Sequence, residues 1–196
     1  MTDRPGMSAA VAPHGLRRDA RRNYERILAA ARDVFGESGA DAAMEEIATR
    51  AGVGVGTVYR RFASKDALID ELLRLALNEL LADAERALMR TDGLGLHELL
   101  YAFGRSFAEH ARYANLLLER QPDAAAERAI SDAIVELTAR AITAGTVSEH
   151  ITVTDVIALA SALRGLIHAG GEVNPSTWRR FLDIHLSGMK APTTER

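Results

Sequence analysis

Apolar residues recur at helical spacing along almost the whole chain, and this pattern limits the fold more than any other feature of the sequence. One apolar stripe runs through residues 27–35, and another runs through residues 96–119. No segment shows the alternation of apolar and polar residues that is typical of a half-buried strand. The sequence therefore predicts an all-α protein of about nine helices.

The composition agrees with helices and excludes several kinds of chemistry. Alanine and leucine are abundant and aromatic residues make up 5%, a balance that favours helix over sheet. The chain has no cysteine, so a disulfide framework, a thiolate zinc site and a cysteine nucleophile are all excluded. The length of 196 residues suits one large domain or two small ones.

Helix boundaries are marked by capping residues. Ser64 is a good N-cap for a long helix that runs to about Met89. Thr152 and Asp155 resemble a capping box with Asp in place of Glu, and Asn174 is followed by proline at the first helical position. These signals divide the second half of the chain into separate helices.

Charge is distributed unevenly along the chain. Residues 1–65 hold 11 Lys and Arg against 8 Asp and Glu, whereas residues 66–196 hold 13 against 19. A basic first part on an acidic remainder suits a protein that orients on a polyanion. Neither a secretory signal nor an apolar run of about 18 residues is visible, so we expect a soluble, cytoplasmic protein without a membrane partner.

The most informative segment is residues 43–62, AMEEIATRAGVGVGTVYRRF. Two short helical stretches flank a tight turn that contains Gly52, the arrangement of a helix-turn-helix. Gly52 follows the first helix at a point where a positive φ is favourable only for glycine. Val58 faces inward on the second helix, whose outer face is free to enter a major groove. AGVGVG is not a phosphate loop, because neither the P-loop Lys-Ser/Thr nor a preceding strand is present.

The same segment carries a family resemblance. AGVGVGTVYRRFASKDALI is similar to the TetR pattern AGVS-x-GT-[LV]-Y-x-[HR]-F-x-[ST]-K-[ED]-x-L, and the upstream RRNYERILAAARDVFGESG resembles the first helix of that family. The resemblance covers residues 20–80 and implies a DNA-binding transcriptional regulator of the TetR type. It implies that Tyr59 and Lys65 contact phosphates. The DNA-contacting residues predicted from the motif and from the basic stretch before it are Arg22, Val55, Gly56, Thr57, Tyr59, Arg60, Arg61 and Lys65.

Two positions depart from the family pattern. The family usually has Ser or Thr before the second helix, where this chain has Asp41-Ala42-Ala43. Asp41 could still cap that helix, although a carboxylate repels phosphate. The third helix starts after Gly54 in place of Ser, which leaves a possible N-cap without a side-chain contact.

Polar residues on apolar helices are the candidates for an effector site. Arg164 and His168 lie one turn apart on one helix and could face a ligand pocket, a dimer seam or solvent. His97, Tyr101 and Arg105 form a second polar stripe at helical spacing, and its surroundings are equally open. The effector-binding candidates are His97, Tyr101, Arg105, Arg164 and His168. The histidines form no HxxH or HxxxH pair and no catalytic motif is present, so we expect no metal site, no cofactor and no enzyme activity.

The predicted organisation is a disordered arm at 1–16, a three-helix DNA-binding head within residues 20–80, and an effector-binding and dimerisation body at 81–196. One recognition helix contacts few base pairs, so we expect a homodimer on a palindromic double-stranded operator, with an unknown small-molecule effector. The resemblance implies repression and a dimer interface formed by residues 152–189. The apolar positions that could supply this interface are Val156, Leu159, Leu163, Leu166, Phe181 and Leu182. The alternative is a DNA-associated helical interaction module without an effector.

Overall fold

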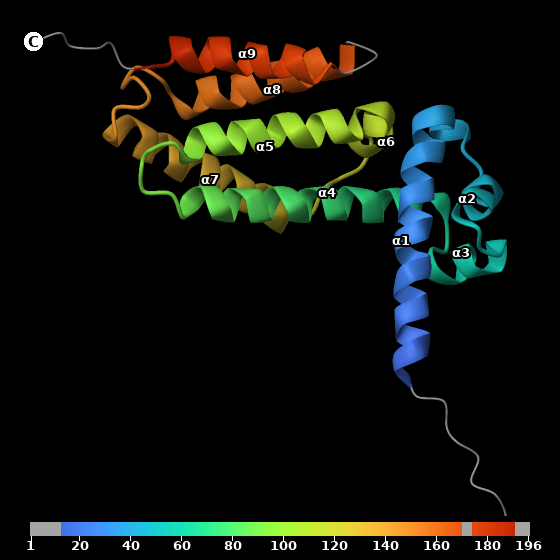
Figure 1. Ribbon diagram of the computed structural model, residues 1–196. Coiled ribbons are helices and arrows are strands. Elements are labelled where there is room, and N and C mark those ends of the chain that lie inside the picture. The colour runs from blue at the N-terminus through green and yellow to red at the C-terminus, as the bar shows by residue number, and fades with distance from the viewer. Residues whose placement is uncertain (1–12, 170–173, 191–196) are drawn as a thin grey trace, which may run out of the picture. The chain divides into compact units, whose positions relative to one another are not determined.

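The computed structural model describes residues 13–169 and 174–190, and within them it has nine α-helices and two short 3-10 turns (Figure 1). The predicted all-α fold of about nine helices is confirmed. Residues 1–12 of the expected arm lie outside the described residues, and the first helix begins at Pro13. The helices are α1 (Pro13–Ser38), α2 (Met44–Ala51), α3 (Val55–Arg61), α4 (Lys65–Leu88), α5 (Gly95–His110), α6 (Ala114–Leu118), α7 (Ala124–Thr143), α8 (Val153–Ala169) and α9 (Pro175–Gly188).

The predicted caps of α4, α8 and α9 are confirmed. The hydroxyl of Ser64 accepts a hydrogen bond from the Ala67 amide at 3.1 Å, one turn into α4. Thr152 and Asp155 form a reciprocal box, in which each backbone amide donates to the other side chain at 2.8 and 3.3 Å. The side chain of Asn174 accepts a hydrogen bond from the Ser176 amide at 2.9 Å, and Pro175 lies between these two residues. These bonds satisfy amides that have no partner within the helix.

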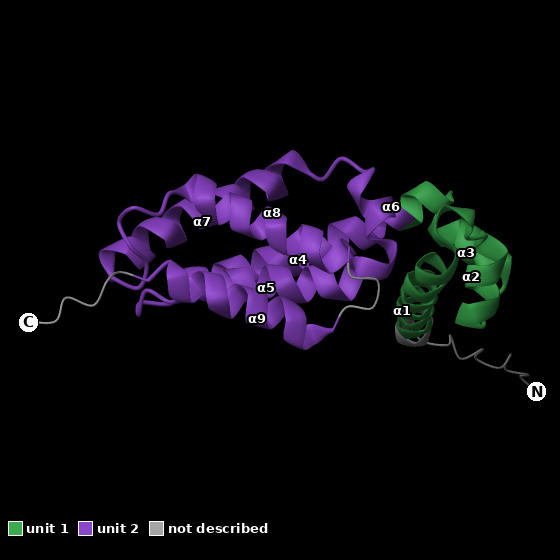
Figure 2. Ribbon diagram, turned by 90° about the horizontal axis from the view of Figure 1, so that it is seen from above, with its two compact units in different colours: residues 1–68 green, residues 69–196 purple. Residues whose placement is uncertain are grey.

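The chain divides into two compact units, residues 1–68 and residues 69–196 (Figure 2). In the first unit, one face of α1 packs against α2, and α2 packs against α3. Ile27, Val34 and Phe35 of α1 and Ile47 of α2 are at most 1% exposed, which makes the predicted stripe the core of this unit.

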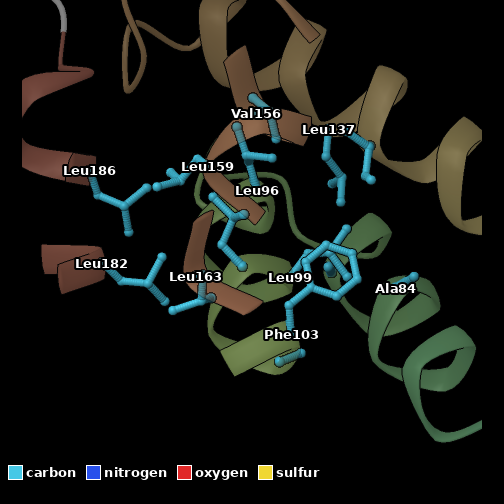
Figure 3. Close-up of a cluster of buried hydrophobic side chains, with 14 of the residues drawn as sticks. Ala84, Leu96, Leu99, Phe103, Leu137, Val156, Leu159, Leu163, Leu182 and Leu186 are labelled. Carbon is cyan, nitrogen blue, oxygen red and sulfur yellow. The ribbon is translucent and has the colours of Figure 1, made fainter. Parts of the chain in front are cut away.

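In the second unit, α5 is the central helix and packs against α7, α8 and α9. Leucines of α5 meet apolar side chains of those three helices in one cluster, to which Ala84 of α4 also contributes (Figure 3). Leu99 of α5, Leu163 of α8 and Leu182 of α9 are each fully buried. Among the described residues, no helix is both long and apolar enough to cross a membrane.

Gly104 of α5 lets an aromatic ring lie directly on the helix backbone. A Cβ atom built at Gly104 would approach the Trp178 ring of α9 to 2.4 Å, which is closer than real carbon contacts. Trp178 is 3% exposed as a result, and its ring also lies 6.3 Å from that of Tyr101. This glycine therefore allows α5 and α9 to approach closely.

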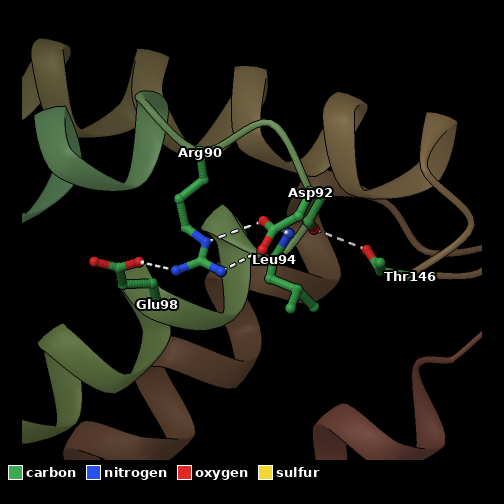
Figure 4. Close-up of polar contacts among 6 residues, drawn as sticks. Arg90, Asp92, Leu94, Glu98 and Thr146 are labelled. Carbon is green, nitrogen blue, oxygen red and sulfur yellow. Dashed lines mark hydrogen bonds and ion pairs between the residues drawn. The ribbon is translucent and has the colours of Figure 1, made fainter.

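The turn between α4 and α5 is fixed by an arginine and an aspartate (Figure 4). Arg90 pairs with Asp92 and also reaches Glu98 of α5 at 3.1 Å. Oδ1 of the same aspartate, which accepts from Arg90 Nε, also accepts a hydrogen bond from the Leu94 amide at 3.1 Å. Thr146, at the end of α7, donates to the Gly93 carbonyl at 2.8 Å, which joins this turn to a distant part of the chain.

The segment 96–119 is not the single helix that its apolar spacing predicts. α5 ends at His110, a 3-10 turn occupies Ala111–Tyr113, and α6 follows. The histidine ring bonds back to the Ser106 carbonyl at 2.6 Å, where the helix ends. Tyr113 and Leu116 are buried in the segment that follows.

Candidate nucleic-acid interface and ligand cavity

The turn between α2 and α3 has the backbone geometry that the sequence predicts. Gly52 adopts φ 61° and ψ 41°, and its amide donates to the end of α2. Such a left-handed residue ends a helix at low energy only when it lacks a Cβ atom. Gly54 then caps α3 from an extended conformation without a side-chain bond, as expected.

An arginine of α1 braces this turn, and the sequence analysis missed it. Arg26 donates to the Gly52 carbonyl at 3.1 Å, and a Cβ atom on the glycine would lie 2.3 Å from the guanidinium. Arg50 of α2 forms a bidentate pair with Glu37 of α1, at 2.8 and 3.0 Å. No local motif marks either contact, because each joins residues that are far apart in sequence.

The outer face of α3 is exposed. Val55 is 40% exposed and Tyr59 is 45% exposed, values that are unusual for large apolar and aromatic side chains. Gly56 and Arg60 are also exposed and Thr57 is half-buried. Val58, on the opposite face, is fully buried together with the neighbouring Phe62. The helix therefore presents one face to the core and the other to solvent.

The remaining basic candidates differ in their surroundings. Arg22 is exposed on α1. Arg61 lies over the Tyr24 ring of α1 at 4.7 Å, and that ring stacks on Phe62 at 6.0 Å. This cation–π contact holds Arg61 against α1.

Tyr59 and Lys65 both have protein contacts. The Tyr59 hydroxyl donates to the Glu45 carboxylate across a long 3.5 Å. Lys65 is half-buried and donates to the Ala40 carbonyl, which ties the start of α4 to the turn before α2. Asp41 does not cap α2. The N-cap is Ala43, which makes no side-chain bond.

A cavity of about 330 Å³ lies inside the second unit. It lies among α4, α5, α6, α7 and α8, and leucines from α4 and α6 form much of its wall. Phe107 of α5 adds an aromatic surface. A mostly apolar cavity of this size with a few polar groups is typical of a small-molecule site.

Two of the five effector-binding candidates line this cavity. Arg164 and His168 contribute from α8. Burial and the nearby Arg164 lower the pKa of His168 below its ordinary value of 6.5. A neutral imidazole can both donate and accept hydrogen bonds at neutral pH.

The other three candidates lie elsewhere in the same unit. Tyr101 donates to Asp183 of α9, and Arg105 pairs with Asp83 of α4 at 3.3 Å. His97 is half-buried, and burial followed by the charge of Lys190 lowers its pKa below 6.5. Helical spacing places these three residues on one stripe, but Tyr101 and Arg105 have their partners on α9 and α4, and Arg105 stays exposed.

The structure adds polar cavity residues that the sequence analysis missed. His110 is 5% exposed and lines the cavity, as do Ser106, Arg120 and Glu127. Arg120 lies 3.7 Å from Asp70 of α4. His110 stands one turn after Ser106, but only the packing of α4 and α8 around them encloses a cavity.

Together, the fold and the exposed face of α3 define the class of protein, a helix-turn-helix DNA-binding regulator with a separate helical body. Comparisons with known proteins agree. The family model of "Bacterial regulatory proteins, tetR family" matches residues 27–72. The model of "Transcriptional regulator SbtR-like, C-terminal domain" matches residues 97–191.

A TetR transcription regulatory protein from Mycobacterium vanbaalenii is 30% identical with a TM-score of 0.64, across 90% of this chain and 99% of that one. SCO0520 from Streptomyces coelicolor is 28% identical with a TM-score of 0.64, across 87% and 99%. The regulator UidR of Escherichia coli K12 is 38% identical over 76 residues, which span 38% of this chain and only 35% of UidR. The chain belongs to the TetR family of transcriptional regulators and binds DNA.

Proposed function

We propose that this regulator is a ligand-responsive repressor that acts as a homodimer on a palindromic operator. The cavity in the helical body is the observation that carries the ligand response. Residues 20–80 serve as the DNA-binding domain and residues 81–196 as the effector-binding and dimerisation domain. Repression is the usual role in the family.

The exposed face of α3 supports a role in base contact. Val55, Gly56, Thr57 and Arg60 lie in the part of the helix that would enter a major groove. The remaining predicted DNA contacts, to backbone phosphates, come from Arg22, Tyr59, Arg61 and Lys65.

The apolar positions of α8 and α9 that the sequence suggests for the dimer interface are not free to form it, so other residues of these helices have to do so. Val156, Leu159 and Leu163 of α8 and Leu182 of α9 are buried within the subunit's own core, and Leu166 and Phe181 are half-buried. The exposed apolar side chains are Ile157, at 48%, and Ile184, at 57%. Ala158 and Ala162 of α8 are also exposed, and their small side chains would allow a second subunit to approach closely.

Coupling between ligand and DNA would run through α4. This helix lines the cavity with leucines and carries Lys65 at its first residue. A ligand that binds more tightly to one position of α4 shifts the helix toward that position. The shift changes the distance between the two DNA-binding heads of a dimer, so that this distance no longer matches the spacing of the operator half-sites. An interaction module without an effector would bind DNA with no such response.

Fluorescence anisotropy with DNA that flanks the gene of this protein tests the proposal. We expect binding whose affinity falls with salt, and we expect Tyr59→Ala and Lys65→Ala to weaken it. Lys65→Ala should also reduce the salt slope by about 1, because one phosphate contact is lost. Arg128→Ala, which removes an exposed arginine of α7, is the control and should leave the salt slope unchanged.

Thermal unfolding separates a DNA role of Lys65 from a structural one. Loss of the bond to the Ala40 carbonyl alone would lower stability and leave the salt slope unchanged. Unchanged DNA affinity in both the Tyr59 and Lys65 variants would contradict the assigned phosphate contacts.

A further inference from the structure

His110 has a buried ring nitrogen that no group among the described residues satisfies. The residue is 5% exposed and lines the cavity. Its Nε2 atom is buried and has no hydrogen-bond partner within the part of the chain that the structure describes. Buried polar atoms in native proteins nearly always have a partner, and because His110 lines the cavity, a bound ligand is the candidate partner for this atom.

The other ring nitrogen fixes which atom carries the proton. Nδ1 lies 2.6 Å from the Ser106 carbonyl oxygen, which can only accept a hydrogen bond. Nδ1 therefore holds a hydrogen, which leaves Nε2 as the acceptor of that tautomer. The edge of the same ring contacts the Tyr113 ring at 5.7 Å, so its orientation is held from two sides.

The charges at the cavity favour a neutral ligand. Arg120 and Arg164 are positive and Glu127 is negative. Asp70 lies 3.7 Å from Arg120 and offsets its charge. The charges thus balance, and most of the remaining wall consists of leucine, alanine and phenylalanine side chains. The volume of about 330 Å³ lies near the lower end of the range for ligand pockets, which suits a small molecule.

We propose that the effector is a small, neutral, apolar molecule that carries a hydroxyl group, a phenol or an alcohol, and that this hydroxyl donates a hydrogen bond to Nε2 of His110. This inference rests on the proposed ligand response and names the class of ligand. The apolar body lies against Phe107 and the leucines of α4, and the hydroxyl determines its orientation.

Calorimetry on the whole protein without DNA tests this with the matched probes 4-butylphenol and 4-butylanisole, which differ in whether the oxygen can donate. We expect the phenol to bind about tenfold to a hundredfold more tightly, because the ether leaves the buried acceptor unpaired. His110→Asn keeps an N–H group near the Ser106 carbonyl and removes the acceptor at the Nε2 position. This variant should bind both probes with similar affinity.

His185→Asn is the matched control. His185 of α9 also bonds through Nδ1 to the carbonyl four residues earlier, at 2.8 Å, but it is exposed and does not line this cavity. The preference for the phenol should persist in this variant. If His110→Asn fails to fold, ¹⁵N-histidine NMR of the wild type gives the same information, because only the phenol should shift the Nε2 resonance of His110.

Equal binding of the two probes, binding of neither, or tighter binding of 4-butylbenzoate than of the phenol would overturn the proposal. A preference for the phenol that survives in His110→Asn would do so too. Each of these results leaves the DNA-binding experiment unaffected. Conversely, if the protein prefers the phenol but its DNA affinity is the same with and without the phenol, the proposed ligand response is contradicted and the proposed ligand class still holds.

Discussion

At the scale of single residues, Gly52 meets two requirements of the turn at once. Its backbone has a positive φ, and the guanidinium of Arg26 occupies the space that a Cβ atom would need. We expect Gly52→Ala to lower the free energy of unfolding by about 1–2 kcal/mol in urea denaturation. Gly56→Ala is the control with the opposite sign, since a Cβ atom there would meet none of the described residues within 4 Å and alanine stabilises a helix by about 0.5–1 kcal/mol. Equal losses in both variants would contradict this account.

Tyr101 should ionise unusually late. Burial, and then its hydrogen bond to Asp183, raise its pKa from 10.0 to about 12. The contribution to stability is therefore fully present below pH 10 and is lost as the pH rises through about 12. An ultraviolet absorbance titration should show a late-titrating component in the wild type that is lost in Tyr101→Phe. A titration curve that keeps this component in Tyr101→Phe, in protein that is still folded by circular dichroism, would argue against this hydrogen bond.

At the scale of elements, the start of α8 depends on its capping box. Thr152→Ala removes one side-chain partner of the box and should lower the free energy of unfolding by about 1 kcal/mol at neutral pH. The hydrogen bonds from Thr152 also hold the pKa of Asp155 below 3.8. The stability from the ionised carboxylate is thus present above that value and is lost as the pH falls below it.

Chemical denaturation of wild type and Asp155→Asn at neutral and acid pH checks this element. The stability gap between them should narrow in acid, where the wild-type carboxylate also becomes neutral. Asp132→Asn replaces an exposed aspartate of α7 and is the control, for which we expect little difference at either pH. A gap that stays constant with pH would show that the charge of Asp155 does not stabilise α8.

At the scale of the whole molecule, the proposed dimer surface should be sensitive to charge. Ile184→Glu places a carboxylate on both sides of a symmetric interface, so its effect counts twice. We expect the dimer to dissociate about a hundredfold more readily in sedimentation equilibrium, and operator affinity to fall with it. Val135→Glu introduces the same charge at a side chain of α7 that is 51% exposed and should leave the dimer intact. Dissociation in both variants, or in neither, would place the interface elsewhere.

Much of the fold could be predicted because its signals are local. The stripe of α1, the Ser64 cap and the Gly52 turn each depend on residues within a few positions of one another. The exposed face of α3 follows from the same local pattern, since Val58 faces the core whereas Val55 and Tyr59 of the same helix do not. The break at His110 could not be predicted from the spacing of apolar residues alone.

The cavity was only partly predictable. Arg164 and His168 line it, whereas Tyr101 and Arg105 share an equally polar stripe and pair with α9 and α4. Spacing tells which residues share a face of a helix, but not which neighbour covers that face. His110 was missed for the same reason.

The order of residues by itself determined most of the helices, the caps of α4, α8 and α9 and the tight turn before α3, because hydrogen bonds and side-chain sterics over a few residues decide them. The packing of helices that are far apart in sequence decided which polar side chains line the cavity and which apolar side chains remain on the surface. Trp178 against Gly104 and the buried ring of His110 exist only once α5 has met its neighbours. Burial is a property of the assembled core, to which segments far apart in the chain contribute together.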